Sequence, residues 1–187
     1  MYGMVHTAAR SMVVETMGEA AWQNILAQAD LDGEYFISGQ NYSDEVTFAL
    51  IDAVTKASGI ETAALLKNFG RYWIGYTAKS PYGTMFRVGG DRLDTFLMNL
   101  NRMHASVHST MPASRMPSFE LLRNEDGRMD VLYTSDRTGL FAFVEGLLSG
   151  LMDYFGVTGH ITHALTEEGD VFSLHCNGNN THLRGVA

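Results

Sequence analysis

The sequence predicts an α+β fold, in which helices come first and a strand–strand–helix–strand–strand order follows. Apolar residues recur at the three- and four-residue spacing of helices until about residue 110. After Pro112 the pattern changes to short alternating runs that are joined by glycine-containing turns. Hydrophobic residues make up 45% of the 187 residues and charged residues 18%, so the chain can bury a sizeable core.

The first part is expected to form four helices, over residues 2–17, 19–29, 43–58 and 61–76. Gly18 is a suitable end for the first of these helices, and Ser43 is a suitable N-cap for the third. The fourth helix has a bulky face that includes Phe69, Tyr72, Trp73 and Tyr76. Residues 81–83 and 89–90 then break the helical pattern, because proline and glycine punctuate helices.

The next helix is expected over residues 93–107, and Asp91 or Asp94 can open it. Its apolar residues have the spacing of a helix with one buried face, and His104 falls within that face. A histidine that points inward is either a core residue whose polar atoms are satisfied or a residue that holds a bound group.

The second half is expected to contain two β-hairpins that flank one helix. The helix covers residues 140–155 and ends before Gly156. In the first hairpin, residues 119–122 pair with residues 129–133. In the second hairpin, residues 161–165 pair with residues 171–174. Residues 112–117 connect the two halves, and residues 177–187 lack any pattern, so we expect a loose tail there.

The composition argues against several classes of function. The formal net charge of -8 and the pI near 5.2 argue against nucleic-acid binding, which needs clustered basic residues. No run of about 18 apolar residues exists, so we expect no membrane insertion, and the N-terminus does not have the pattern of a signal peptide. The single cysteine, Cys176, permits no intrachain disulfide and suits a reducing, cytoplasmic location.

Two groups of residues are candidates for chemistry. His104 and His108 lie one helical turn apart and could face one metal, but no acidic residue accompanies them in a zinc-protease pattern. Tyr133, Ser135 and Arg137 alternate at the end of a strand, so they share one of its faces. A phenol, a hydroxyl and a guanidinium on one face suit one or two carboxylates, although a solvated strand end would also explain them.

The two features together fit a haem. An isolated neutral imidazole on an apolar helix face can be the axial ligand of the iron, and the Tyr–Ser–Arg face can bind the propionates. The sequence has no C-x-x-C-H segment, so covalent attachment of a haem is excluded. It also lacks the nucleophile-elbow, Walker and dinucleotide-binding patterns.

The sequence resembles the haem-nitric oxide/oxygen binding (H-NOX) domains, which include the haem domain of the soluble guanylate cyclase beta subunit. Residues 133–137 match the family's Y-x-S-x-R motif, and residues 99–104 (Asn-Leu-Asn-Arg-Met-His) resemble its N-L-D-x-L-H segment. Further segments that look alike are 1–5, 69–76, 116–119 and 144–150. The likeness extends to about Leu174, which is nearly the whole chain.

The resemblance implies one haem domain over residues 1–176. It implies a helical lobe over about residues 1–60, an α+β lobe over about residues 61–176, and a non-covalent b-type haem between the two lobes. By the same resemblance, the axial iron ligand is His104, and the residues that bind the propionates are Tyr133, Ser135 and Arg137.

Other positions follow from the resemblance as well. Pro117 is expected to press on the haem and distort it, and Met4 and Leu100 are expected to line its site. Phe143 occupies the position at which oxygen-holding members carry a tyrosine, so we expect binding of NO and CO and exclusion of O2. Trp73 matches another distal position, where its indole N–H either donates to the bound gas or fills space.

The expected function is that of a gas sensor and not of an enzyme. Binding of NO to a ferrous haem is expected to weaken the bond to His104 and to change the conformation that a separate partner reads. A sensor histidine kinase or a cyclic-dinucleotide enzyme is the expected partner, and a cysteine-based zinc site is not expected, because Cys176 is alone.

Two other classes of function stay open from the sequence. One is a haem enzyme that turns over NO or peroxide, for which His6 is the nearest acid–base candidate. The other is a haem-free module that binds a different hydrophobic ligand in the same cavity.

Overall fold

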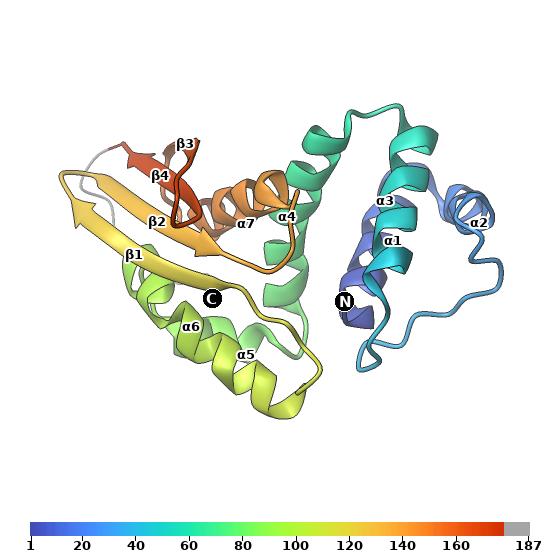
Figure 1. Ribbon diagram of the computed structural model, residues 1–187, viewed down its shortest axis with the longest axis horizontal. Helices are drawn as coiled ribbons and strands as arrows, with labels where there is room; N and C mark the ends of the chain where they lie inside the picture. The colour runs from blue at the N-terminus through green and yellow to red at the C-terminus, as the bar shows by residue number, and fades with distance from the viewer. Residues whose placement is uncertain (178–187) are drawn as a thin grey trace.

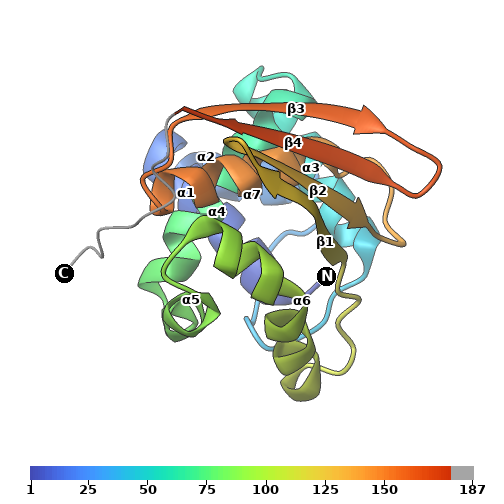
Figure 2. The same ribbon diagram turned by 90° about the vertical axis from the view of Figure 1, so that its left-hand side faces the viewer.

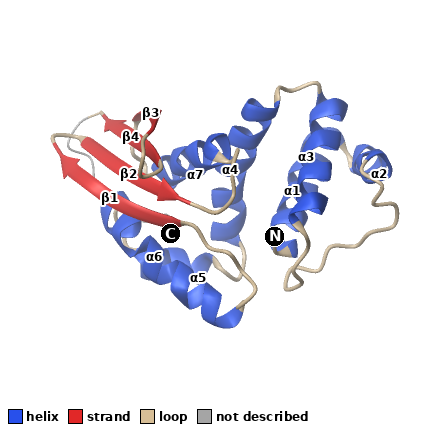
Figure 3. Ribbon diagram, in the orientation of Figure 1, coloured by secondary structure: helices blue, strands red, loops and turns tan. Residues whose placement is uncertain are grey.

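The computed structural model describes residues 1–177 and confirms the α+β fold (Figure 1, Figure 3). The helices of this part of the chain are α1 (Gly3–Met17), α2 (Glu19–Gln28), α3 (Asp44–Ser58), α4 (Thr62–Lys79), α5 (Gly83–Gly89), α6 (Leu93–Thr110) and α7 (Phe141–Tyr154). Helices α1 to α3 lie on one side of α4, and the sheet lies on the other (Figure 1). The tail predicted over residues 177–187 lies, apart from its first residue, outside the described residues.

Four antiparallel strands form one sheet in the order β1-β2-β4-β3 (Figure 2). The strands are β1 (Ser118–Glu125), β2 (Arg128–Thr134), β3 (Gly159–Leu165) and β4 (Asp170–Cys176). Both predicted hairpins are confirmed, and pairing of β2 with β4, such as Val131 opposite Phe172, joins them into one sheet. The strands are longer than predicted because their ladders continue into polar residues beside the turns, where hydrophobic alternation gives no signal.

Buried side chains form two separate clusters. The first, which we call the helical core, includes Val13, Trp22, Ile25, Leu26, Phe36, Leu50, Val54 and Leu65. The second, which we call the sheet core, includes Ile74, Phe96, Leu97, Leu100, Met129, Val131, Leu148, Phe155, Phe172 and Leu174. Helix α4 contributes to both clusters, because Leu65 near its beginning packs in the helical core and Ile74 farther along packs in the sheet core.

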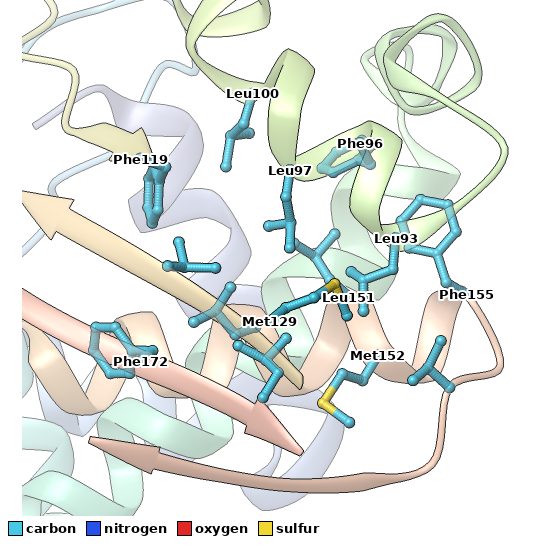
Figure 4. Close-up of a cluster of buried hydrophobic side chains, with 14 of the residues drawn as sticks. Leu93, Phe96, Leu97, Leu100, Phe119, Met129, Leu151, Met152, Phe155 and Phe172 are labelled. Atoms are coloured by element: carbon cyan, nitrogen blue, oxygen red, sulfur yellow. The ribbon is translucent and has the colours of Figure 1, made fainter. Parts of the chain in front are cut away.

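The apolar face of α6 packs on the sheet core, as its residue spacing predicts. Leu93, Phe96, Leu97 and Leu100 point from α6 toward the strands and α7 (Figure 4). Burial of each such side chain stabilises the fold by about 1.5–3 kcal/mol. His104 lies four residues beyond Leu100, so the helical repeat directs it to the same side, at the edge of this core.

Helices α4 and α7 cross in close backbone contact because glycines occupy the crossing point. A Cβ atom on Gly70 would lie 2.2 Å from the carbonyl oxygen of Phe143. A Cβ atom on Gly146 would lie 2.1 Å from the carbonyl oxygen of Lys67. Only glycine permits this approach. The crossing therefore fixes the residues that follow on each helix, among them Trp73 on α4.

Three local predictions differ from the structure. The segment between the two predicted breaks forms α5, which buries Phe86 against Phe96 at a ring distance of 5.2 Å. The N-cap residue of α6 is Arg92, and neither Asp91 nor Asp94 takes that position. Ser43 is the N-cap residue of α3, as predicted, but its side chain makes no capping hydrogen bond. Among the described helices, none is long and apolar enough to cross a membrane.

Candidate functional site

Two adjoining cavities, of about 190 and 200 Å³, lie where helices α1, α4, α6 and α7 meet the end of the sheet. They share wall residues, including Met4, Trp73, His104 and Leu147, and we call them together the central cavity. Every site residue predicted from the sequence lines this space: Met4, Trp73, Leu100, His104, Pro117, Tyr133, Ser135, Arg137 and Phe143. Largely apolar walls with a few polar groups are typical of a site for a small organic ligand.

His104 enters the central cavity from α6 and is held by one hydrogen bond. Its Nδ1 lies 3.1 Å from the carbonyl oxygen of Pro117. Because a carbonyl can only accept, Nδ1 carries the proton and Nε2 keeps its lone pair. Burial lowers the pKa of His104, and the Pro117 carbonyl offsets part of this effect. Burial, the larger influence, favours the neutral ring, and the hydrogen bond to Pro117 selects its tautomer, which is the form that binds a metal.

A side-chain clamp joins α6 to β1 two residues beyond the Pro117 carbonyl that orients His104. Asn101 Nδ2 donates to the carbonyl oxygen of Phe119 over 2.8 Å, and Asn101 Oδ1 accepts from the Phe119 amide, also over 2.8 Å. The Phe119 ring lies 5.8 Å from the His104 ring. Asn101 belongs to the segment 99–104 noted in the sequence, but no sequence pattern predicted that its side chain would join α6 to β1.

Tyr133, Ser135 and Arg137 lie together at the end of β2, on the rim of the central cavity. The Arg137 amide donates to Ser135 Oγ over 3.1 Å, which holds these two residues together just beyond the end of β2. Burial raises the pKa of the Tyr133 phenol, so it stays protonated and able to donate. The strand end therefore places the three predicted side chains on one rim.

Arg137 also has a carboxylate partner that the sequence did not indicate. Its Nε lies 3.1 Å from Asp44 Oδ2, at the beginning of α3. Arg115 forms a second ion pair with the same Asp44 oxygen. Burial raises the pKa of Asp44, but hydrogen bonds from Arg137 and the Met1 amino group outweigh burial, so this pKa lies below its ordinary value. These ion pairs join the two sides of the central cavity.

The wall opposite the rim is aromatic and apolar. Trp73 lines both parts of the central cavity, and Phe143 lines the part that contains the rim. Phe69 stacks on Phe143 at a ring distance of 5.5 Å and packs edge-on to Trp73 at 6.4 Å. The buried hydroxyl of Thr77 also lines the cavity and has no hydrogen-bond partner within residues 1–177.

The other histidines near this region lie outside the central cavity. His108 is exposed, and its Nδ1 lies 3.1 Å from the Ser114 carbonyl oxygen. His6 is buried in the helical half, where its Nε2 lies 2.9 Å from Thr47 Oγ1, and burial lowers its pKa to about 4. In residues 1–177, no group of three or more His, Cys, Asp or Glu side chains could hold a metal ion.

The fold and the central cavity define a domain with a largely apolar cavity between two packed halves. A family model described as "Haem-NO-binding" (HNOB) matches residues 2–163, and the chain belongs to this family. The family consists of haem-binding gas-sensor domains, which are also called H-NOX domains.

Curated relatives include soluble guanylate cyclases of animals. The chain is 28% identical over 151 residues to soluble guanylate cyclase gcy-34 of Caenorhabditis elegans, which covers 79% of this chain and 22% of that protein. It is 23% identical over 171 residues to soluble guanylate cyclase 89Db of Drosophila melanogaster, covering 91% of this chain and 26% of that protein. The chain therefore spans about a quarter of the length of these relatives.

Solved structures with the same fold include bacterial H-NOX proteins. The H-NOX protein from S. oneidensis in the Fe(II) ligation state, as a triple mutant, matches with a TM-score of 0.87 and 19% identity, over 98% of this chain and 100% of that chain. The Fe(II) unliganded H-NOX protein from K. algicida matches with a TM-score of 0.81 and 20% identity, over 96% and 98% of the two chains.

Proposed function

We propose that this chain binds one b-type haem non-covalently in the central cavity and senses NO, and CO, while excluding O2. The observation that carries the proposal is the geometry of His104. It is the one imidazole that lines the cavity among the described residues, and its proton lies on the nitrogen that faces Pro117. A ferrous haem supplies an iron that binds these gases and that holds its axial histidine less tightly when NO is bound.

The chain's own residues suit the two ends of such a group. The Nε2 lone pair of His104 is the proposed axial ligand, and Pro117 fixes the ring orientation. Tyr133, Ser135 and Arg137 are the proposed propionate ligands, because a phenol, a hydroxyl and a guanidinium are the donors that a carboxylate requires. Met4 and Leu100 are proposed to contact the porphyrin from the apolar walls.

The proposed gas selectivity depends on the aromatic wall. Bound O2 takes on partial negative charge and needs a hydrogen-bond donor, whereas NO and CO need one much less. Phe143 offers no donor, and we propose that its ring therefore disfavours O2. Trp73 is the nearby side chain that could donate, through its indole N–H.

The proposed output passes through α6. His104 belongs to α6, and the Asn101 clamp and the Pro117 carbonyl join this helix to the beginning of β1. His104 would tie α6 to a haem bound in the cavity, so loss of that bond would leave the helix held only by its contacts with β1 and the sheet core. A ligand that favours one of two arrangements in this way shifts their populations. The proposed reader is a separate protein, either a sensor histidine kinase or a cyclic-dinucleotide enzyme.

An absorption spectrum of the haem-loaded protein tests the proposal. The ferrous protein is expected to show a Soret band that shifts with NO and with CO but not with air. His104→Gly is expected to lose most of its haem and to regain it when free imidazole is supplied. His108→Gly is the matched control, since His108 lies on the same helix and is exposed, and it should keep a normal spectrum.

Each alternative function predicts a different result in the same experiment. A His104→Gly protein with full haem content and an unchanged spectrum would overturn the axial assignment. Failure of the wild-type chain to take up haem would instead favour a module for another hydrophobic ligand. Sustained turnover of NO, or of peroxide without an added reductant, would favour a haem enzyme. We further propose that residues 1–176 form the haem domain, with lobes that divide near residue 60.

A further inference from the structure

Three aromatic side chains of α4 form a continuous row from the central cavity toward the protein surface. The Trp73 and Tyr76 rings lie 6.4 Å apart at an interplanar angle of 28°. The Tyr76 and Tyr72 rings lie 6.1 Å apart at 27°. Residues three and four positions apart share a helix face, so the helix itself holds these rings in place. Trp73 lines the cavity, and the two tyrosines do not.

The outer end of the row has a proton acceptor. The Tyr72 hydroxyl donates to Glu15 Oε1 of α1 over 2.7 Å, and Glu15 is exposed to solvent. Burial and the neighbouring Glu15 carboxylate raise the pKa of Tyr72, so the phenol is fully protonated at neutral pH. A phenol that loses an electron becomes a strong acid, and here a carboxylate is already hydrogen-bonded to it.

All three ring systems belong to the side chains that give up one electron most readily in proteins, since Trp and Tyr are oxidised far more easily than Phe. The neighbouring Phe69 and Phe143 rings lack this property. The oxidisable rings therefore lead from Trp73, on the cavity wall, to Tyr72, beside Glu15. A purely structural role would need only large apolar rings. It would not explain why the last phenol is paired with a solvent-exposed carboxylate.

We propose that Trp73, Tyr76 and Tyr72 form an electron-transfer path that carries oxidising equivalents from the central cavity to the surface at Glu15. This inference rests on the proposed function, because the oxidising equivalents arise when peroxide reacts at a haem in the cavity. Its role is to spare the gas-binding site from oxidative damage by moving the oxidised group to the surface, where solutes can reduce it.

The electrons and protons balance in each passage. Trp73 loses one electron toward the cavity and regains one from Tyr72 through Tyr76, and the Tyr72 proton moves to Glu15. Reduction of one hydrogen peroxide to two waters consumes two electrons and two protons. Two such passages supply the two electrons, and solvent supplies the two protons, which the oxidation of ascorbate returns to solvent. The Tyr72 radical returns to the phenol when it takes one electron from a solute reductant, such as ascorbate, and its proton from Glu15.

Radical trapping on the haem-loaded protein tests this path. The ferric protein is mixed with hydrogen peroxide and a nitroso spin trap, and peptide mass spectrometry then locates the adducts. The expected result is adduct mainly on Tyr72. Ascorbate added before the trap is expected to remove most of it.

Conservative variants separate transfer from packing. Tyr76→Phe keeps the ring and is expected to lower the Tyr72 adduct several-fold and to raise adduct on Trp73. Glu15→Gln keeps the hydrogen bond but removes the proton acceptor, and it is expected to lower the Tyr72 adduct several-fold. Tyr154→Phe is the matched control, because Tyr154 is a partly exposed tyrosine outside the row, and it is expected to leave the Tyr72 adduct unchanged.

Adduct confined to the cavity-lining tyrosines Tyr2, Tyr82 and Tyr133 would overturn the path, as would a Tyr72 adduct that Tyr76→Phe and Glu15→Gln leave unchanged. The Soret band distinguishes this failure from failure of the proposed function. A protein with a normal Soret band and no adduct on the row contradicts the path alone. A protein that takes up no haem contradicts both proposals.

Discussion

At the scale of single residues, Phe143 is the position where one added atom should change gas selectivity. Phe143→Tyr places a hydroxyl in the wall of the central cavity. A hydrogen bond to a partly charged acceptor is worth about 1.5 kcal/mol, which corresponds to about tenfold in affinity. We expect the ferrous variant to form a stable oxygen complex in air, detected as a shift of its Soret band.

The matched control for this prediction is Phe69→Tyr. Phe69 stacks on Phe143 but does not line the central cavity, so the same hydroxyl lies outside it. We expect Phe69→Tyr to keep the unliganded spectrum in air. If Phe143→Tyr also keeps that spectrum, the missing hydroxyl does not determine the exclusion of O2.

Single residues were predictable where a local pattern carried the information. The apolar stripe of α6 placed His104 inward, and strand alternation predicted one face for Tyr133, Ser135 and Arg137. The structure gathers all four around one cavity, but β2 ends at Thr134, so alternation does not explain the positions of Ser135 and Arg137. Their partners were not predictable in the same way. The acceptor for His104 is a backbone carbonyl, and sequence patterns carry no signal for which carbonyl a side chain will meet.

At the scale of elements, the crossing of α4 and α7 should be intolerant of even one methyl group. Gly146→Ala would place a Cβ 2.1 Å from the Lys67 carbonyl oxygen, so the helices would have to separate. Such overpacking costs about 1–3 kcal/mol. We expect the free energy of unfolding, measured by urea titration of the haem-free chain, to fall by that amount.

Gly75→Ala supplies the contrast on the same pair of helices. Gly75 is exposed on α4, and among the described residues no atom beyond its chain neighbours and its own helix backbone lies within 4 Å of an added Cβ. Alanine favours a helix over glycine by about 1 kcal/mol, so this variant should be more stable than wild type. Equal effects of the two substitutions would show that close backbone contact does not account for the glycine at position 146.

Elements with a clear period were predictable, including the ten-residue α2 and the strands of the two hairpins, whereas α5 was not. Helices α1, α3, α4, α6 and α7 lie close to their predicted ranges because each has an apolar face several turns long. Helix α5 has seven residues between glycine-containing breaks, which is too short to show a period. Its helical state depends on packing of Phe86 against Phe96, a contact that exists only in the folded chain.

At the scale of the whole molecule, the ion pairs of Asp44 should stabilise the contact between the two halves. It receives Arg137 and Arg115 from one side of the cavity and belongs to α3 on the other. Hydrogen bonds between charged groups contribute about 2 kcal/mol when partly buried. We expect Asp44→Asn to lower the free energy of unfolding of the haem-free chain by about that amount, as measured in urea at neutral pH.

The pH dependence of this effect has a definite sign. The folded-state pKa of Asp44 lies below its ordinary value of 3.8, so its contribution is present above that value and is lost as the pH falls through the folded pKa. The stability difference between wild type and Asp44→Asn should therefore shrink below about pH 4. Asp52→Asn, which removes an exposed ion pair with Lys56 on the same helix, should cost less than about 0.5 kcal/mol.

The order of helices and hairpins gave the α+β class, but the closure of the two halves around one cavity could not be derived from local patterns. Asp44 and Arg137 are separated by 93 positions in the chain. From the sequence, Asp44 was one of two acidic residues in the first turn of a helix, and nothing nearby suggested a distant partner. The resemblance to a known family, and not periodicity, supplied the expectation of two lobes.

The presence of α4 in both cores limits how this chain can be cut, grafted or recombined. The helix has eighteen residues and is therefore about 27 Å long. A fusion junction or domain swap placed just before α4 would remove Leu65 from the helical core and leave its apolar residues open to water. A junction after α4 would remove Ile74 from the sheet core. Chimaeras with other members of the family should therefore exchange the whole domain, because a junction on either side of α4 separates a residue of this helix from the core in which it packs.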